Sequence, residues 1–465
     1  MSRRARAALV LAAGAAASSC AVGPDYGRPA LEVPATYREE AAAPPSAQAL
    51  DTEWWSLFGD PTLTALEEEA RDANQDLQLA VARVEETRAT ARIAASDFFP
   101  TVTLDPAYRT GRASATRPSS TSSTGSYAQE VVVPFDLSYE IDFWGRVRRT
   151  FESATAVAHA SESGYRVVAL AVASDVASQY FAIRSLDAQS AILDDSIGIF
   201  EDNLRLVEAR YRAGLVSELD VAQARTQRSN TVARRADVQR QRAEAEHALA
   251  VLCGRPTEDF SVAAQPLDLS PPEIPAGVPS DLVEHRPDVV EAEQNLEAAN
   301  AEVGVAEALF FPQVRLTGAA GLDSASFGDL VKWESRIWEV GPSISVPVFE
   351  GGRLRANLSG AQARYEEGVA AYRQTVLGAF RDVEDALVGV RLRAAQADAV
   401  SDAVTAAARA VSVSRSQYDH GITDYLQVIV AESTHLDLEL QAAQIRQQRL
   451  DSAVQLVKAI GGGWQ

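Results

Sequence analysis

The chain has 465 residues, of which 46% are hydrophobic, so it can form sizeable cores and is not a disordered protein. Its formal net charge is −21 at pH 7. A chain this acidic should be repelled by phosphate backbones, and we expect no nucleic-acid partner.

The first twenty residues have the pattern of an export signal. Three arginines precede an apolar run, and small residues follow it before Cys20. The run is too short to span a bilayer. We therefore expect residues 1–19 to be a signal peptide and Cys20 to carry the lipid anchor of an N-terminal segment over residues 20–60. A plain signal peptide followed by an incidental cysteine is the alternative.

The rest of the chain offers neither a disulfide nor an ordinary membrane helix. Cys253 is the only other cysteine, so it has no partner within a mature chain. No later segment has eighteen uninterrupted apolar residues, which argues against a transmembrane helix.

Proline is absent from two long stretches, residues 135–255 and 348–465, although the chain has 20 prolines. Average usage of about 5% would place several in each stretch. Proline breaks helix interiors, so both stretches can hold long helices. We expect two long helices over about 146–252 and two more over about 353–458.

Three short motifs occur twice, in the same order. They are Phe-Phe-Pro at 98–100 and 310–312, Gly-Arg-x-Arg at 145–148 and 352–355, and Tyr-x-x-Gly at 211–214 and 418–421. This order and near-constant spacing predict a duplicated unit. We assign repeat 1 to residues 61–255, a linker to 256–280, and repeat 2 to 281–465.

Between the first two motifs of each repeat, apolar and polar side chains alternate, which is the period of a β-strand. The predicted strands cover about 101–110, 131–143, 313–322 and 338–348. Their length of about ten residues suits tilted strands that cross a bilayer. Strands of a soluble sandwich look similar, and several prolines fit poorly in strands, so both interpretations stay open at this point.

Four strands cannot close a membrane barrel alone, because known barrels have at least eight and an open edge in lipid leaves backbone groups unpaired. Several copies must then contribute. The last predicted helix also has apolar residues at alternating three- and four-residue steps, the seam of a coiled coil. We predict a mainly α fold with a membrane β-barrel, in which each protomer supplies four strands and four long helices.

Four further motifs suggest a family. They are Cys20-Ala21-Val22-Gly23-Pro24-Asp25-Tyr26, Trp54-Trp55-x-x-Phe58-x-Asp60-Pro61-x-Leu63, Asn74-x-Asp76-Leu77 and Arg286-Pro287-Asp288. In this order they resemble the outer-membrane factor family of tripartite efflux pumps, the TolC-type channel-tunnels, especially the lipid-anchored branch. The resemblance implies a homotrimer with a twelve-stranded barrel in outer-membrane lipid and a helical tunnel in the periplasm. It also implies two partners, a periplasmic adaptor protein and an inner-membrane resistance-nodulation-division transporter.

The resemblance further implies a periplasmic tip at about 211–220 and 418–427, which an adaptor engages and which is closed at rest. The residues matched to this tip and gate are Tyr211, Gly214, Asp220, Tyr418, Gly421 and Asp424. Tyr418 would link to Asp220 of a neighbouring helix pair; an ordinary turn with solvated polar residues is the alternative.

The chain departs from the family pattern beside this tip. Several members place carboxylates six or nine residues after the second turn glycine, but Gln427 and Val430 stand here, so a carboxylate ring would need Asp424 or Glu432. Thr423 also stands where an arginine latch can occur.

We expect a passive exit duct for small molecules, driven by a separate pump. The sequence has no glycine-rich phosphate loop with lysine, and its five histidines lack ligand spacing, so we expect no enzyme activity, cofactor or metal. A channel for protein secretion and a non-conducting trimeric coiled-coil surface scaffold are the alternatives.

Overall fold

The computed structural model describes residues 21–31, 36–38, 52–112, 114, 127–274 and 285–463. The predicted signal peptide and Cys20 lie outside the described residues. The chain divides into two compact units, each assembled from three segments. Unit 1 is Met1–Ala30, Val84–Ser161 and Ala292–Tyr372, and unit 2 is Leu31–Arg83, Glu162–Glu291 and Arg373–Gln465.

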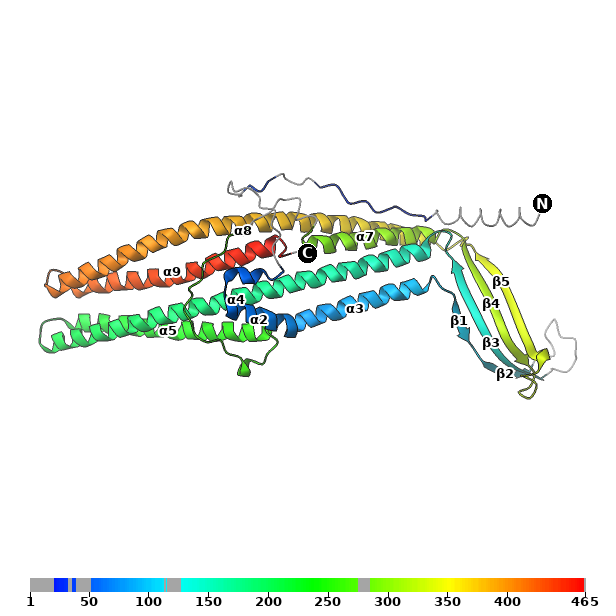
Figure 1. Ribbon diagram of the computed structural model, residues 1–465, viewed down its shortest axis with the longest axis horizontal. Helices are drawn as coiled ribbons and strands as arrows, with labels where there is room; N and C mark the ends of the chain where they lie inside the picture. Colours follow the sequence, from blue (N-terminus) through cyan, green and yellow to red (C-terminus); the bar gives the residue numbers. More distant parts are fainter. Residues whose placement is uncertain are drawn as a thin grey trace. The chain divides into compact units, whose positions relative to one another are not determined.

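Unit 1 contains an antiparallel sheet (Figure 1). Its strands are β1 (Thr101–Leu104), β2 (Ala107–Arg112), β3 (Tyr127–Ile141), β4 (Gln313–Ser324) and β5 (Arg336–Ser345). The order is β1-β3-β4-β5, and β2 pairs with β3 beyond the end of β1. The segment expected as one strand over 101–110 is therefore two short strands, separated at Pro106. Proline has no N–H for the ladder, which explains the break.

The register separates apolar from polar side chains, because residues directly opposite each other share a face of a sheet. One row across the sheet is Leu104, Phe135, Ala320 and Trp338, and the next row, on the other face, is Thr103, Asp136, Ala319 and Glu339. The apolar face is not covered by other parts of the described chain: Phe135 is 55% and Trp338 79% exposed. A soluble sandwich would bury this face, whereas a lipid-facing strand leaves it on the outside.

Residues 21–28 lie along the helical part of unit 1. The Val22 N–H donates to the Trp144 carbonyl at 3.0 Å, and Arg28 makes two 2.7 Å hydrogen bonds to the Glu293 carboxylate. At Gly23, where φ is +100°, a Cβ would lie 2.5 Å from the Gly304 Cα. Only glycine fits there, since the two backbones touch. This segment is thus fixed close to the end of β3.

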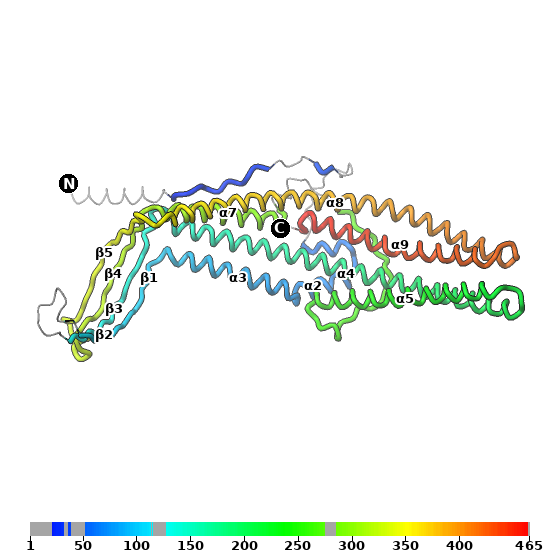
Figure 2. Tube along the Cα trace, turned by 180° about the vertical axis from the view of Figure 1, so that it is seen from behind, coloured from blue at the N-terminus to red at the C-terminus, as the bar shows by residue number. Residues whose placement is uncertain are grey.

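Helices occur in matching lengths along the chain. α4 (Arg146–Arg212) and α8 (Arg353–Asp419) each have 67 residues, α5 (Glu218–Leu252) and α9 (Tyr425–Ala459) each have 35, and α3 (Gln75–Ser96) and α7 (Pro287–Ala308) each have 22. Figures 1 and 2 show α5 folded back along α4, and α9 along α8. One described helix, α4, has a stretch long and apolar enough to cross a membrane by length and composition alone, and 44% of this stretch is buried. The sequence patterns predict no helix at the positions of α3 and α7.

The core of unit 2 forms around the Trp54-to-Leu63 motif. Residues Trp54–Phe58 make the short 3-10 helix η1, and α2 (Pro61–Ala73) follows with Asp60 as its N-cap. Phe58 packs on Phe181 of α4 with ring centroids 5.0 Å apart. The motif therefore supplies core packing and a helix start.

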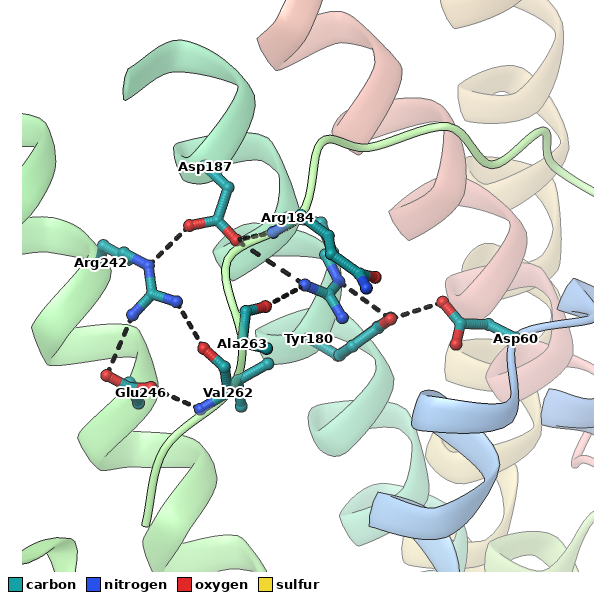
Figure 3. A network of polar contacts seen from close by, with 9 residues as sticks. Asp60, Tyr180, Arg184, Asp187, Arg242, Glu246, Val262 and Ala263 are labelled. Atoms are coloured by element: carbon teal, nitrogen blue, oxygen red, sulfur yellow. Dashed lines mark hydrogen bonds and ion pairs between the residues drawn. The ribbon is translucent and has the colours of Figure 1, made fainter. Parts of the chain in front are cut away.

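A polar network connects this motif to the chain after α5 (Figure 3). Tyr180 donates to Asp60 and accepts from Arg184 at 2.9 Å, and Arg184 reaches the Ala263 carbonyl at 2.6 Å. Arg242 of α5 binds Asp187 at 2.6 Å and the Val262 carbonyl at 2.7 Å. The segment after η2 (Thr257–Asp259) is thereby held across α4 and α5.

Candidate functional site at two helical turns

The turn between α4 and α5 and the turn between α8 and α9 both belong to unit 2 and pack together. Their shared apolar cluster contains buried Val207, Ala224, Tyr425 and Val428, with partly buried Tyr418 against it. Tyr211 is exposed beside this cluster. The structure thus brings the predicted tip residues of both repeats into one place.

Each turn depends on a glycine in the left-handed region. Gly214 has φ +76° and Gly421 has φ +68°. After each glycine an N–H closes the helix end: Leu215 donates to the Arg210 carbonyl and Ile422 to the Gln417 carbonyl, both at 2.9 Å. These bonds form a Schellman-type cap, which needs a residue that tolerates positive φ.

The two aspartates expected at the tip lie at helix starts. The Asp220 carboxylate accepts from the Ser217 N–H at 2.8 Å, while the Asp220 N–H donates to the Ser217 hydroxyl at 3.4 Å, which is a capping box. Asp424 caps α9 by accepting from the Gln427 N–H at 3.2 Å. Both side chains therefore stabilise the turns themselves.

Arg210, which the sequence analysis did not single out, connects the two turns. Its guanidinium lies over the Tyr418 ring, 4.7 Å from the centroid, and 3.6 Å from the Asp419 carboxylate. Tyr418 also packs on Tyr425, with ring centroids 5.4 Å apart. The buried Tyr418 hydroxyl has no hydrogen-bond partner within the described part of this chain. A link from Tyr418 to Asp220 of another helix pair stays a prediction.

Glu432 is unsuited to a carboxylate ring. It is only 5% exposed, accepts from Arg415 Nε at 2.7 Å, and is contacted by Asn203 Nδ2 at 3.0 Å. Burial, and next the charge of Glu432, raises the pKa of the Tyr425 hydroxyl above its usual value. Of the two substitutes considered for the missing ring, only the exposed Asp424 lies at the surface.

The described residues offer little for catalysis. They include no group of three or more His, Cys, Asp or Glu side chains that could hold a metal ion. Burial raises the pKa of the Cys253 thiol to about 12, so this cysteine is not a thiolate nucleophile near neutral pH.

Comparison with known proteins identifies the class. The sequence profile of the family described as "Outer membrane efflux protein" matches residues 66–255 and 278–462. The solvent efflux pump outer membrane protein SrpC of Pseudomonas putida is 35% identical over 463 residues, which cover 96% of both chains. Outer membrane protein OprJ of Pseudomonas aeruginosa is 32% identical over 463 residues, covering 96% of this chain and 93% of OprJ.

Solved structures agree with this result. The outer-membrane channel OprN superposes with a TM-score of 0.90 at 31% identity, covering 96% of this chain and all of that one. The CmeC outer membrane channel of Campylobacter jejuni gives a TM-score of 0.92 at 25% identity and covers 96% of each chain. This chain belongs to the outer membrane efflux protein family. It is an outer-membrane efflux channel protein and not an enzyme, as the sequence predicted.

Proposed function

We propose that three copies of the chain form one twelve-stranded barrel in the outer membrane, continued by a tunnel of helices. The observation that supports this is the open sheet of unit 1. Among the described residues, no further strand pairs with the outer edges of β1, β2 or β5, while the apolar face is exposed. Unpaired strand edges are too costly in hydrocarbon to persist, and neighbouring copies can supply the missing partners.

Disulfide trapping between edges tests this assembly. Thr103→Cys on β1 is combined in turn with Gly341→Cys, Ser343→Cys or Ser345→Cys on β5, all on the polar face. We expect one combination to give dimer and trimer bands on oxidation, while each single variant gives none. A native mass of one chain in detergent, together with no cross-linking in any combination, would contradict the trimer.

The tandem repeat is part of the same proposal. The equal lengths of α3 and α7, α4 and α8, and α5 and α9 support it, as do the matching bonds at the two turns. Two similar halves in each of three chains would place six helix pairs around one tunnel. Neighbouring helix pairs in such a ring need nearly the same contact surface, and a repeated half supplies it.

An acyl chain on Cys20 would anchor the protein in the inner leaflet of the outer membrane. Support comes from Val22, whose N–H binds the Trp144 carbonyl just after β3, so Cys20 precedes a residue fixed at the end of the sheet. Mass spectrometry of the purified protein tests this: a mass with acyl groups beginning at Cys20 is expected, and Cys20→Ser should remove them.

The transported molecules are proposed to be small and to arrive through a periplasmic adaptor from an inner-membrane resistance-nodulation-division transporter. The names of relatives, which include solvent, toluene and antibiotic efflux proteins, support small-molecule export over protein secretion. Deleting the gene and measuring the accumulation of a panel of dyes, antibiotics and solvents tests it. Unchanged accumulation of every compound, with loss of a secreted protein instead, would favour the secretion channel.

The two turns are proposed to form the tip that closes the tunnel, with Tyr418 bonded to Asp220 of a neighbouring helix pair. The buried, unpartnered Tyr418 hydroxyl supports this. In planar bilayers Asp220→Ala and Tyr418→Phe should each conduct more than the unmodified channel. Ser217→Ala is the matched control, because it removes the Ser217 hydroxyl from the same cap but leaves the Asp220 carboxylate in place. Equal currents for Asp220→Ala and Ser217→Ala would contradict the latch.

A further inference from the structure

The end of the sheet that lies farthest from the helices of unit 1 has a rim of exposed aromatic side chains (Figure 1). The opposite end joins the helices, since β3 ends at Ile141 and α4 begins at Arg146. Phe327, in the loop between β4 and β5, stacks on Tyr108 of β2 with ring centroids 5.5 Å apart. Tyr108 is opposite Val131 on the apolar face, so this loop folds onto that face. The aromatic rim consists of Tyr108, Tyr127, Phe327, Trp333 and Trp338, each more than half exposed.

Two exposed arginines accompany the aromatic rim on the apolar face. The strand register places Arg112 opposite Tyr127 and Arg336 opposite Leu322, both in apolar rows. The Arg112 guanidinium lies over the Tyr127 ring, 5.5 Å from the centroid, and that of Arg336 lies over the Trp333 ring, 3.6 Å from the centroid. Neither arginine forms an ion pair with a described residue. A guanidinium held on a ring face keeps the N–H groups at its edge available to an anion.

The acidic side chains of the strands near this end lie on the other face. By register, each of them is in a polar row, and they are Glu130, Asp323 and Glu339. In the loop between β4 and β5, Asp329 is paired with Lys332. Glu334 is the remaining acid of this loop, and it is exposed. The apolar face therefore carries two arginines beside aromatic rings, while the carboxylates of the strands point to the opposite side.

This combination of side chains fits a lipid with phosphate groups. Tryptophan and tyrosine are enriched where a membrane protein crosses from hydrocarbon to headgroups. The planar guanidinium matches the oxygens of a phosphate and binds them through paired hydrogen bonds. Next to the aromatic rim, the apolar row with Phe135 and Trp338 continues the same face and suits acyl chains. One molecule that satisfies both parts has a phosphorylated headgroup and several acyl chains.

We propose that the aromatic rim binds lipid A, the phosphorylated glycolipid of the outer leaflet, with its phosphates on Arg112 and Arg336 and its acyl chains along the apolar face. This inference rests on the proposed barrel, in which the helices extend into the periplasm and the far end of the sheet reaches the outer leaflet. In that ring β5 of one copy adjoins β1 and β2 of the next. Each junction between copies then presents both arginines, and a trimer has three such junctions.

Native mass spectrometry of the full chain in detergent, titrated with diphosphoryl lipid A or with phosphatidylglycerol, tests the proposal. Three chains should bind up to three lipid A molecules, about tenfold more tightly than phosphatidylglycerol. Arg112→Gln and Arg336→Gln should each weaken lipid A binding about fivefold, because each removes one positive charge at a lipid surface. Arg336→Lys keeps the charge but not the planar fork, and should weaken binding about twofold. Arg109→Gln is the matched control and should change nothing, since Arg109 is on the same strand as Arg112 but pairs with Glu130 on the polar face.

Several results would overturn the proposal. Equal lipid A affinity of the unmodified chain and of the double variant Arg112→Gln with Arg336→Gln would do so. The same holds for an equal loss of affinity in Arg109→Gln, for equal affinity toward phosphatidylglycerol, and for intact trimers that bind no lipid A. The lipid-free mass in the same spectra tests the assembly separately. A single-chain mass would contradict the trimer, whereas arginine-dependent binding of lipid A to single chains would still support this site.

Discussion

Buried carboxyl groups in unit 2 differ in whether they have partners. Glu432 lies between Arg415 and Asn203, whereas Glu67 is buried with one oxygen that has no partner among the described residues. A paired acid contributes to stability through its partners, while an unpaired one imposes a cost that grows when it must ionise. The two residues should therefore respond differently to substitution.

We expect Glu67→Gln to change how stability depends on pH. The pKa of Glu67 is about 9 in the folded chain, against a usual value of 4.5. The folded state therefore keeps a proton that the unfolded state loses, so the stability contributed by this group is complete below about pH 4.5 and is lost as pH rises through about 9. Thermal unfolding followed at pH 5 and pH 8 should show Glu67→Gln more stable, relative to the unmodified chain, at pH 8 than at pH 5. Glu68→Gln should show no such change, and parallel profiles for all three proteins would contradict a raised pKa at Glu67.

Arg210→Ala should loosen the contact between the two turns. It removes the cation–π contact with Tyr418 and the ion pair with Asp419, together worth about 1 kcal/mol at a partly exposed site. Hydrogen exchange of peptides that cover residues 416–426 should become severalfold faster. Arg205→Ala is the control, because Arg205 pairs with no described residue other than the nearby Asp202, on an exposed helix face. Equal exchange in both variants would show that Arg210 does not hold the turns together.

The residues at the two helical turns could be predicted from the sequence only where their role is local. Gly214 and Gly421 follow from the repeated Tyr-x-x-Gly pattern, because a helix end in the left-handed region is set by neighbouring residues. Arg210, and the burial and pairing of Glu432, could not be predicted in this way. Their partners come from other helices, as with Asn203 and Glu432, and only the packing of α4 against α9 defines that contact.

At the scale of elements, the backbone conformation of two glycines predicts opposite effects of an alanine substitution on stability. Gly421→Ala should destabilise the turn by about 1 kcal/mol or more, since alanine is strained at φ +68°. Gly378→Ala should instead stabilise by up to about 1 kcal/mol, because Gly378 is inside α8 and a Cβ there meets nothing within 4 Å. Thermal unfolding of both variants measures the difference. A loss of stability from Gly378→Ala, or none from Gly421→Ala, would contradict this account.

Prolines predicted the helices better than they predicted the strands. The two proline-free stretches coincide with α4, α5, α8 and α9. Pro106 does interrupt a strand, but Pro134 lies inside β3, opposite Gly321 of β4. A Cβ added to Gly321 would lie 2.2 Å from the Val133 carbonyl oxygen. A glycine on the next strand thus makes room for the chain at this proline, and such a cross-strand match is visible only once the register is known. α3 and α7 were missed because each lies close to prolines and has no clear apolar stripe.

At the scale of the whole molecule, the sequence showed that four strands are too few to close a barrel but not which edges remain open. The register answers this for the described chain: β1 and β2 form one edge and β5 the other, with polar and apolar faces continuous across them. The register of one chain does not define the number of copies, because a closed ring of any number of such sheets pairs all the open strand edges. The proposed trimer therefore depends on the family and on the cross-linking test.

The two faces of this sheet should respond oppositely to the same new charge. Phe135 and Asp136 are neighbours on β3, but Phe135 lies in the apolar row and Asp136 in the polar row. If the apolar face contacts lipid, Phe135→Arg places a guanidinium in hydrocarbon at a cost of about 2–4 kcal/mol near the bilayer centre, whereas Asp136→Arg faces an aqueous lumen and costs little. Fractionation of cells should find Phe135→Arg depleted from the outer membrane and Asp136→Arg present at normal levels. Equal insertion of both variants would mean that neither face contacts lipid, and a deficit confined to Asp136→Arg would mean that the apolar face points into the barrel.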